Sequence, residues 1–330
     1  MSWSWIKRGA GLVMAALVSV TAMAAPPPER PAAGDGHVPP VPLLWKVDGA
    51  DGAALYLLGS FHLLKPADYP LSADVDTAFA ASRQLLFELA PEEMGSPALA
   101  TQMAQSALRQ DGRELKDDLD AETWQRLQAY AAANGLPLER LAGLKPWFVG
   151  LTISLAQMAR QGLDAASGLD RHLMARAADA GKSALGLESA AAQIALLDGM
   201  EIDEQRQLLR EALEQVDKGD EQSRRLHDAW RRGDAETLWH DMAAQMKRDY
   251  PALYRRINSE RNDAWLAPLQ TRLQAGQGTT LVVVGALHLL GEDGVVEKLR
   301  ARGYPVQRVC TACVPEPGAE PTAAGKRRRR

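Results

Sequence analysis

Residues 55–64 read LYLLGSFHLL, and residues 281–290 read LVVVGALHLL. In both stretches four apolar residues precede a Gly, and a His follows that Gly by three positions, at His62 and His288. A short apolar run bounded by Gly is typical of a buried strand that ends in a turn. The sequence therefore predicts two similar strands, far apart in the chain, that each present a histidine.

The glycines of the repeat, Gly59 and Gly285, favour a turn in which the backbone bends sharply or approaches a ligand closely. A His just beyond such a Gly projects from the carboxyl edge of its strand, where open α/β sheets bind ligands. A single His after a strand is more often a hydrogen-bonded structural residue, but this pattern uses two of only six histidines. We expect His62 and His288 to lie together in one site.

Strand patterns occur mainly towards the two ends of the chain. Residues 44–60 predict two strands around a turn, QLLFELA predicts a buried strand ending in Glu88, and TTLVVVG and YPVQRV predict the last two strands. The residues between, about 96–275, have helical patterns, interrupted by a short strand ending in Glu188. We predict an α/β (α+β) fold with a central mixed sheet built from N- and C-terminal segments and a large helical insertion. The sequence leaves three roles open for this insertion: a lid, a substrate wall or a partner surface.

Two carboxylates follow predicted strands. Two imidazoles alone make neither a stable metal site nor most hydrolytic sites, and a carboxylate is needed as a ligand or as the base that activates water. Glu88 is the leading candidate, because an acid at the end of a buried apolar strand is costly unless it has a partner. Glu188 has the same placement after a weaker strand, and we expect it to orient a histidine.

A third polar feature is the pair Arg261-Asn262 within SERNDAW. Next to a reactive site, such a pair holds a substrate carboxylate or stabilises a polarised carbonyl. On composition alone it equally fits a solvated helix face.

Both ends of the chain predict processing or disorder. Lys7 and Arg8 precede an uncharged apolar run and the small-residue cleavage signal Ala22-Met23-Ala24, which together indicate a secretory signal peptide. The Pro-rich segment after it fits a linker, and the terminal KRRRR fits a solvated tail. The predicted domain organisation is a signal peptide at 1–24, a linker at 25–42, a folded domain at 43–314 and a disordered basic tail at 315–330. We therefore expect an exported protein, periplasmic or secreted, with no stable membrane span after cleavage.

The charge distribution argues against one class of partner, nucleic acids. The formal net charge is −4, which becomes −6 without Lys7 and Arg8 and −11 when the five cations of 326–330 are also set aside. An acidic body argues against nucleic-acid binding.

The two cysteines, Cys310 and Cys313, form a CxxC pattern near the C-terminus. A zinc site would need further ligands nearby, and a redox motif usually precedes an opening helix, whereas VPEPG follows here. A short-range disulfide is the favoured interpretation in an exported protein.

The order and spacing of these motifs resemble the TraB/GumN family over about residues 43–309. The matching elements are an early GxxH, a Glu closing the next strand, a central helix and strand followed by Gln, an Arg-Asn pair, and a late GxxH before two glycines. Here these are Gly59–His62, Glu88, Gly168–Glu188 with Gln193, Arg261–Asn262, and Gly285–His288 with Gly291 and Gly294. The family more often has Thr after the first Gly, and Ser60 keeps that hydroxyl.

The resemblance implies a function as well as a fold. The family is similar to the Tiki proteases, which are metal-dependent peptidases, and more distantly to erythromycin esterases and ChaN-like haem-binding proteins. It implies that His62, Glu88 and His288 carry the site and that Arg261 and Asn262 support it. We expect an exported hydrolase of peptides or esters in which the first three residues hold a divalent metal such as manganese, cobalt or zinc.

Other functions fit the same residues. A metal-free hydrolase, esterase-like, would use one histidine as general base while Glu88 fixes its tautomer. A non-catalytic protein would use the paired histidines to hold iron or haem, and an accessory role in envelope polysaccharide is suggested only by the name GumN.

Overall fold

The computed structural model describes residues 38–219, 221–276 and 278–313. The expectations for a signal peptide at 1–24, for most of the linker and for the basic tail at 315–330 lie outside the described residues. The last residues of the expected linker are described and packed, since Pro40 and Pro42 are buried and the N–H of Val41 donates to the carbonyl of Arg231 at 2.8 Å.

One six-stranded mixed sheet forms the centre of the fold, in the order β4-β3-β5-β2-β1-β6. The strands are β1 (Leu44–Asp48), β2 (Ala54–Ser60), β3 (Gln84–Leu89), β4 (Ser183–Glu188), β5 (Thr279–Gly285) and β6 (Val306–Arg308). β4, β3, β5 and β2 run parallel to their neighbours, while β1 is antiparallel to both β2 and β6. Continuous apolar runs such as LVVV in β5 suit this position, because central parallel strands are buried on both faces.

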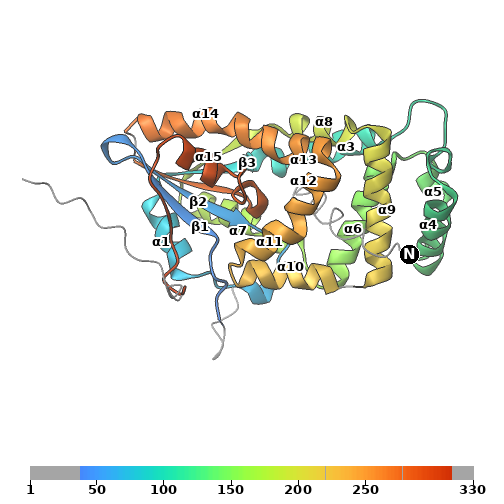
Figure 1. Cartoon of the computed structure of the whole chain (residues 1–330), viewed down its shortest axis with the longest axis horizontal. Coiled ribbons are helices and arrows are strands. Elements are labelled where there is room, and N and C mark those ends of the chain that lie inside the picture. Colours follow the sequence, from blue (N-terminus) through green and yellow to red (C-terminus); the bar gives the residue numbers. More distant parts are fainter. Residues whose placement is uncertain (1–37, 220, 277, 314–330) are drawn as a thin grey trace, which may run out of the picture.

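The helices divide between the sheet and a separate helical region, as Figure 1 shows. Those near the sheet include α14 and α15, while α6 and α9 lie side by side farther out with α4 and α5 beyond them. The helices are α1 (Ala73–Ala81), α2 (Pro91–Met94), α3 (Pro97–Ala107), α4 (Ala121–Ala133), α5 (Glu139–Ala142), α6 (Pro146–Arg160), α7 (Leu169–Asp179), α8 (Ala190–Asp198), α9 (Ile202–Lys218), α10 (Glu221–Arg231), α11 (Ala235–Leu238), α12 (Gln245–Asp249), α13 (Pro251–Tyr254), α14 (Glu260–Gln274) and α15 (Val295–Ala301).

The predicted α/β class and the helical region are confirmed, with one refinement. The chain returns from the helical region to form β4, which pairs with β3 and becomes an edge of the sheet. The helical region also has a hydrophobic core of its own between α4, α6 and α9, built from residues such as Leu127, Ile153 and Leu209. None of the helices in the described part of the chain is both long and apolar enough to span a membrane.

The helical region also contains a buried acid. Glu211 on α9 is 8% exposed, and only one of its carboxylate oxygens has a hydrogen-bond partner, the amide of Gln207 at 2.7 Å. Burial raises the pKa of Glu211 to about 7, assisted by the nearby carboxylates of Glu214 and Asp249 and opposed by Gln207 and Lys218. The folded protein therefore keeps a proton on Glu211 that the unfolded chain has already lost.

This proton makes stability depend on pH. Because the folded-state pKa lies above the ordinary value, the stabilisation is present below pH 4.5 and is lost as the pH rises through 7. Between pH 5 and pH 8 we expect the free energy of unfolding to fall by roughly 2 to 3 kcal/mol from this group. In urea denaturation across this range, Glu211→Gln should remove that part of the slope, whereas Glu236→Gln, at an exposed carboxylate, should retain it. An unchanged slope in Glu211→Gln would contradict the assignment.

Candidate active site

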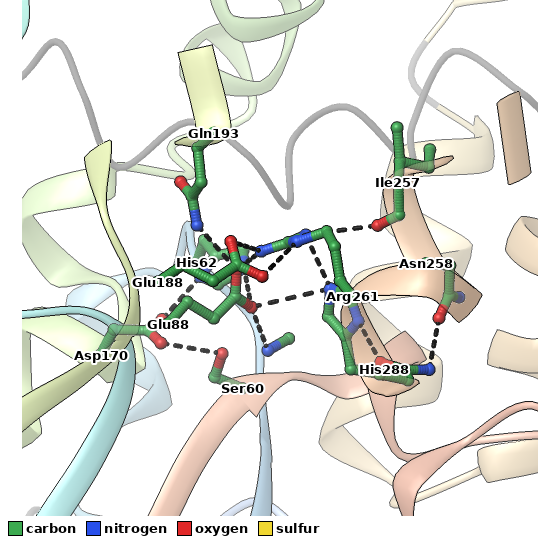
Figure 2. Close-up of polar contacts among 12 residues, drawn as sticks. Ser60, His62, Glu88, Asp170, Glu188, Gln193, Ile257, Asn258, Arg261 and His288 are labelled. Atoms are coloured by element: carbon green, nitrogen blue, oxygen red, sulfur yellow. Dashed lines mark hydrogen bonds and ion pairs between the residues drawn. The ribbon is translucent and has the colours of Figure 1, made fainter. Parts of the chain in front are cut away.

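The carboxyl ends of the four parallel strands converge on one buried cluster of side chains (Figure 2). His62 lies two residues after β2, His288 ends the 3₁₀ turn Ala286–His288 after β5, Glu88 lies in β3 and Glu188 ends β4. Since β5 pairs with β2 on one side and β3 on the other, the two GxxH turns are neighbours and Glu88 lies beside them. The parallel arrangement places all four residues at the same edge of the sheet.

Glu88 is at the centre of the cluster. Its Oε1 lies 3.7 Å from Nε2 of His62 and 3.9 Å from Nε2 of His288, and it accepts a hydrogen bond from the backbone N–H of Gly285 at 2.8 Å. Glu88 lies within β3 and not after its end, and the residue is 5% exposed. Glu88 is therefore a buried carboxylate with partners, as a charged group in a core must be.

His62 is held by an acid that the sequence did not single out. Nδ1 of His62 lies 2.7 Å from Oδ2 of Asp170, and the hydroxyl of Ser60 donates to the other oxygen of Asp170 at 3.1 Å. A carboxylate accepts from Nδ1–H, so Nε2 of His62 faces Glu88, and this nitrogen has no hydrogen-bond partner among the described residues.

Gly168 explains how Asp170 reaches His62. Asp170 lies in the first turn of α7, and a Cβ on Gly168 just before that helix would lie 2.0 Å from the carbonyl oxygen of His62. Only glycine allows the start of α7 to approach the His62 loop this closely. The backbone N–H of Leu169 donates to the carbonyl of Phe61 at 3.3 Å across the same contact.

His288 has a different set of partners. The amide nitrogen of Asn262 donates to Oδ1 of Asn258 at 2.7 Å and to the carbonyl of Asp293 at 2.8 Å, which leaves its oxygen 2.7 Å from Nδ1 of His288. An amide oxygen only accepts, so Nδ1 carries the proton and Nε2 carries a lone pair. The guanidinium of Arg261 donates to that lone pair at 3.0 Å.

Arg261 joins the two carboxylates and His288. It follows the π-helical turn Arg255–Ser259 at the start of α14, and such turns are frequent at functional sites. Its Nη2 donates to Glu88 at 2.7 Å and to Glu188 at 3.1 Å, and its Nε donates to Glu188 at 2.8 Å. The residue is 5% exposed, so a full guanidinium charge is buried and balanced within the site.

The electrostatic environment separates the protonation states of the two histidines. Burial lowers the pKa of His288 to about 3, and the nearby Arg261 acts in the same direction. Burial also disfavours the charged form of His62, but Asp170 and Glu88 outweigh it and raise its pKa to about 9. Burial would raise the pKa of Glu88, yet Arg261 and both histidines lower it to about 2. At neutral pH the site therefore holds the ionised carboxylate of Glu88, the neutral imidazole of His288 and the protonated imidazole of His62 side by side.

The second glycine of the repeat keeps space open beside the reactive atoms. A Cβ on Gly285 would lie 3.1 Å from Nε2 of His62 and 3.2 Å from Oε1 of Glu88. Its φ of −49° is ordinary for any residue, so the absence of a side chain serves the space and not the backbone.

We expect Gly285→Ala to fold but to lose most of its activity and ligand binding, because a methyl group would fill this space. Thermal unfolding should change little, since the nearest atoms are side-chain ends, while activity or metal content should fall at least roughly tenfold. Gly168→Ala, whose Cβ would meet backbone at 2.0 Å, is the contrasting variant and should lower the melting temperature. A Gly285→Ala protein with normal activity would contradict this role.

The structure brings together nearly all the site residues predicted from the sequence: Ser60, His62, Glu88, Glu188, Arg261, Asn262, Gly285 and His288. Gly59 lies just outside the cluster, where a Cβ would lie 3.1 Å from Cα of Ala286 in the second GxxH turn. Glu188 differs from expectation, because it contacts Arg261 and not a histidine. The orienting groups are instead Asp170 for His62 and Asn262 for His288. Cys310 and Cys313 form a disulfide elsewhere.

Sequence reasoning missed Asp170 and Asn258 as site residues. A signal for Asp170 existed, since an acid follows Gly168 by two residues in the first turn of a helix whose apolar face is buried. Asn258 carried no local signal, because its role depends on the π-helical turn that aims it at Asn262.

The donor set fits a divalent metal ion on two conditions. Nε2 of His62 is a buried nitrogen without a partner, Oε1 of Glu88 faces it, and Gly285 leaves room beside both. Imidazole nitrogens with a carboxylate oxygen are common ligands of zinc and related ions. The first condition is that Arg261 releases Nε2 of His288, to which it donates a hydrogen bond. The second is that Nε2 of His62 gives up the proton that its raised pKa keeps there at neutral pH. As arranged, no three His, Cys, Asp or Glu side chains form a ready-made ion cluster within 38–219, 221–276 and 278–313.

Fold and site together define an α/β protein with a buried His-Glu-His cluster at the carboxyl ends of its parallel strands. The profile of the TraB/PrgY/gumN family matches residues 43–308, and the chain belongs to this family. Comparisons with curated proteins and with solved structures gave no significant match.

Proposed function

We propose that this protein is an exported metal-dependent hydrolase, a peptidase in its main activity, that works at the cluster of His62, Glu88 and His288. The main observation in support is that Oε1 of Glu88 lies 3.7 Å from Nε2 of His62 and 3.9 Å from Nε2 of His288 in a buried site. Export is supported by the leader pattern of residues 1–24 and by the disulfide, which is typical of oxidising compartments.

These three residues would hold the ion, and manganese, cobalt and zinc suit the ligand set. A divalent ion bound there would supply Lewis-acid chemistry, polarising a carbonyl and making water a stronger nucleophile at neutral pH. The buried location increases the strength of every electrostatic interaction in the site.

The chain's own polar groups have assignable roles. Asp170 fixes the tautomer and orientation of His62, and Asn262 does the same for His288. Arg261 carries a fixed positive charge next to Glu88, where its electrostatic field can stabilise negative charge that develops on a carbonyl oxygen. His62 is placed to exchange a proton at Nε2 with substrate or water.

A second candidate is a metal-free hydrolase, and the Arg261–His288 hydrogen bond favours it. With that bond in place Nε2 of His288 is occupied. Once His62 has lost the proton that its raised pKa keeps at neutral pH, the His62–Asp170 pair resembles the base and orienting acid of hydrolytic triads. The orienting acid would then be Asp170 and not Glu88, because Asp170 contacts Nδ1 of His62.

The two candidates differ in metal content. We expect protein expressed from residue 25 onward and purified without chelator to contain close to one equivalent of metal by elemental mass spectrometry. His62→Ala, Glu88→Ala and His288→Ala should each lose it, because each removes one donor atom. Circular dichroism and melting temperature establish that the variants are folded, and peptide and ester libraries then identify the activity.

A wild-type protein that stays metal-free after loading with manganese, cobalt and zinc, yet hydrolyses esters or peptides, would replace the first candidate by the second. A protein that contains metal or haem but hydrolyses no library member would contradict both hydrolase candidates. The expected chelator response follows the same logic, since only a metal-dependent activity is lost on chelation and restored by the ion.

A further inference from the structure

The two edges of the sheet are built differently. β6 is only three residues long, and its carbonyl at Val306 accepts a hydrogen bond from the guanidinium of Arg300 at 3.3 Å. β4 has six residues, and three of them, Ser183, Leu185 and Gly186, are exposed. Short length and nearby arginines protect the β6 edge, whereas β4 is a long edge.

The outer side of β4 has unpaired backbone groups. Within the described parts of the chain, the backbone of 183–188 hydrogen-bonds to β3 and to no segment on its other side. A parallel strand paired on one side leaves half of its N–H and C=O groups pointing away from the sheet. These groups form a ladder that an added strand can complete.

β4 also lacks the devices that usually block strand addition. It contains no proline and no charge before Glu188, and Leu185 is 42% exposed. The preceding Lys182 does not cover the edge, because its ammonium donates to the carbonyls of Phe79 at 2.7 Å and Ser82 at 2.5 Å. Lysine side chains on edge strands often block pairing with another strand. The side chain of Lys182 does not block β4 in this way, because these carbonyls hold its ammonium group.

The open strand leads directly into the candidate active site. Its last residue, Glu188, binds Arg261, which in turn binds Glu88. The side chain of Glu188 is 11% exposed, against 5% and 6% for those two partners, so Glu188 lies on the solvent side of the cluster. At about 3.3 Å per residue, Leu185 is only about 10 Å from the strand end. A chain segment paired with β4 would therefore reach the cluster within three or four residues.

We propose that β4 is the docking strand for an extended peptide substrate, which adds to the sheet edge as a further strand and delivers its scissile amide past Glu188 to the cluster. This inference rests on the proposed peptidase function and specifies its substrate class: unfolded segments with at least four residues on one side of the cleaved bond. Backbone pairing supplies affinity that is tolerant of sequence, and exposed Leu185 favours an apolar substrate side chain beside it.

Hydrogen exchange on the wild-type protein tests the docking strand. The probe is the best-cleaved member of a mixed decapeptide library, with its scissile amide replaced by a reduced methylene-amine bond so that it is not consumed. We expect amides within 183–188 to gain protection when this peptide is added, while amides of 306–308 on the other edge do not. Protection confined to other segments would overturn the proposal.

Backbone-modified substrates and edge variants give an independent readout. N-methylation of single amides in the cleaved peptide should lower kcat/KM up to roughly tenfold at alternate positions on one side of the scissile bond, the effect of losing one hydrogen bond. Leu185→Lys should raise KM for the peptide roughly fivefold or more at similar melting temperature, because a charged side chain on the edge strand disfavours pairing with an added strand. Gln307→Lys, which introduces a lysine in the middle of β6, is the control and should leave KM unchanged.

The outcomes separate this inference from the function on which it rests. A wild-type protein that cleaves no peptide contradicts the peptidase proposal itself. A wild-type protein that cleaves peptides, with no alternation in the N-methyl series and equal KM values for Leu185→Lys and Gln307→Lys, contradicts only the role of β4.

Discussion

Arg261→Met is expected to lower the free energy of unfolding by about 3 to 5 kcal/mol, because it leaves buried carboxylates without their cation. Arg261 is 5% exposed, and it donates to Glu88, Glu188 and His288. Removing one partner of a buried charge network costs far more than the network contributes to stability, since the remaining charges keep their desolvation penalty. Urea denaturation monitored by circular dichroism measures the change.

Two further variants identify the cause of this loss. Arg261→Lys keeps the charge but not the fork of donors that contacts both carboxylates, so an intermediate loss is expected. Combining Arg261→Met with Glu88→Gln and Glu188→Gln removes the unpaired charges and should recover part of the stability. If Arg261→Met lowers the free energy of unfolding by less than about 1 kcal/mol, the two carboxylates must find water or other partners. That result would contradict a buried ion network around Arg261.

Glu88→Gln is expected to lower kcat/KM by roughly three orders of magnitude or more, the size of effect seen when a central group of a catalytic unit is removed. The amide keeps the shape of the side chain and can still accept the hydrogen bond from the N–H of Gly285. It lacks the negative charge that faces both histidines and Arg261. The measurement is steady-state kinetics on the best substrate of the libraries, with metal content determined on the same sample.

A matched control is available four residues along the chain. Glu92 on α2 is exposed, so Glu92→Gln makes the same chemical change outside the cluster and should leave kcat/KM within twofold or so of wild type. A Glu88→Gln protein with near-normal activity would exclude Glu88 from the reaction and remove the main support for the His-Glu-His site. Equal stability of the two variants is not required, because kinetics are compared on the folded fraction.

Much of the fold was predictable because it depends on local patterns. The antiparallel pair β1 and β2 around the turn at Asp48, the buried β3 and the apolar β5 were all predicted from short, mainly apolar runs between turn signals. Helices with clear breaks, such as α7 ending near Gly181, followed from their periodicity. These elements are specified by interactions within a few residues, so a sequence window contains the information.

The edge position of β4 was less predictable. Its exposed residues break the usual alternation, and its place next to β3 follows from packing of α7 and α2 rather than from its own sequence. Sheet order is decided by which faces the helices cover, and this information is spread over the whole chain.

The sequence by itself determined that two strands from distant parts of the chain each present a histidine close to a glycine, and that a third buried strand carries an acid near its carboxyl end. It did so because parallel strands buried on both faces must be continuous apolar runs, and any polar group at their ends is conspicuous. Only the tertiary structure decided the partners of those groups. Asp170 reaches His62 through the close approach at Gly168, and Asn258 reaches Asn262 through a π-helical turn. Such contacts depend on how packed helices meet over long chain separations, where a shift of a few ångströms would select a different partner.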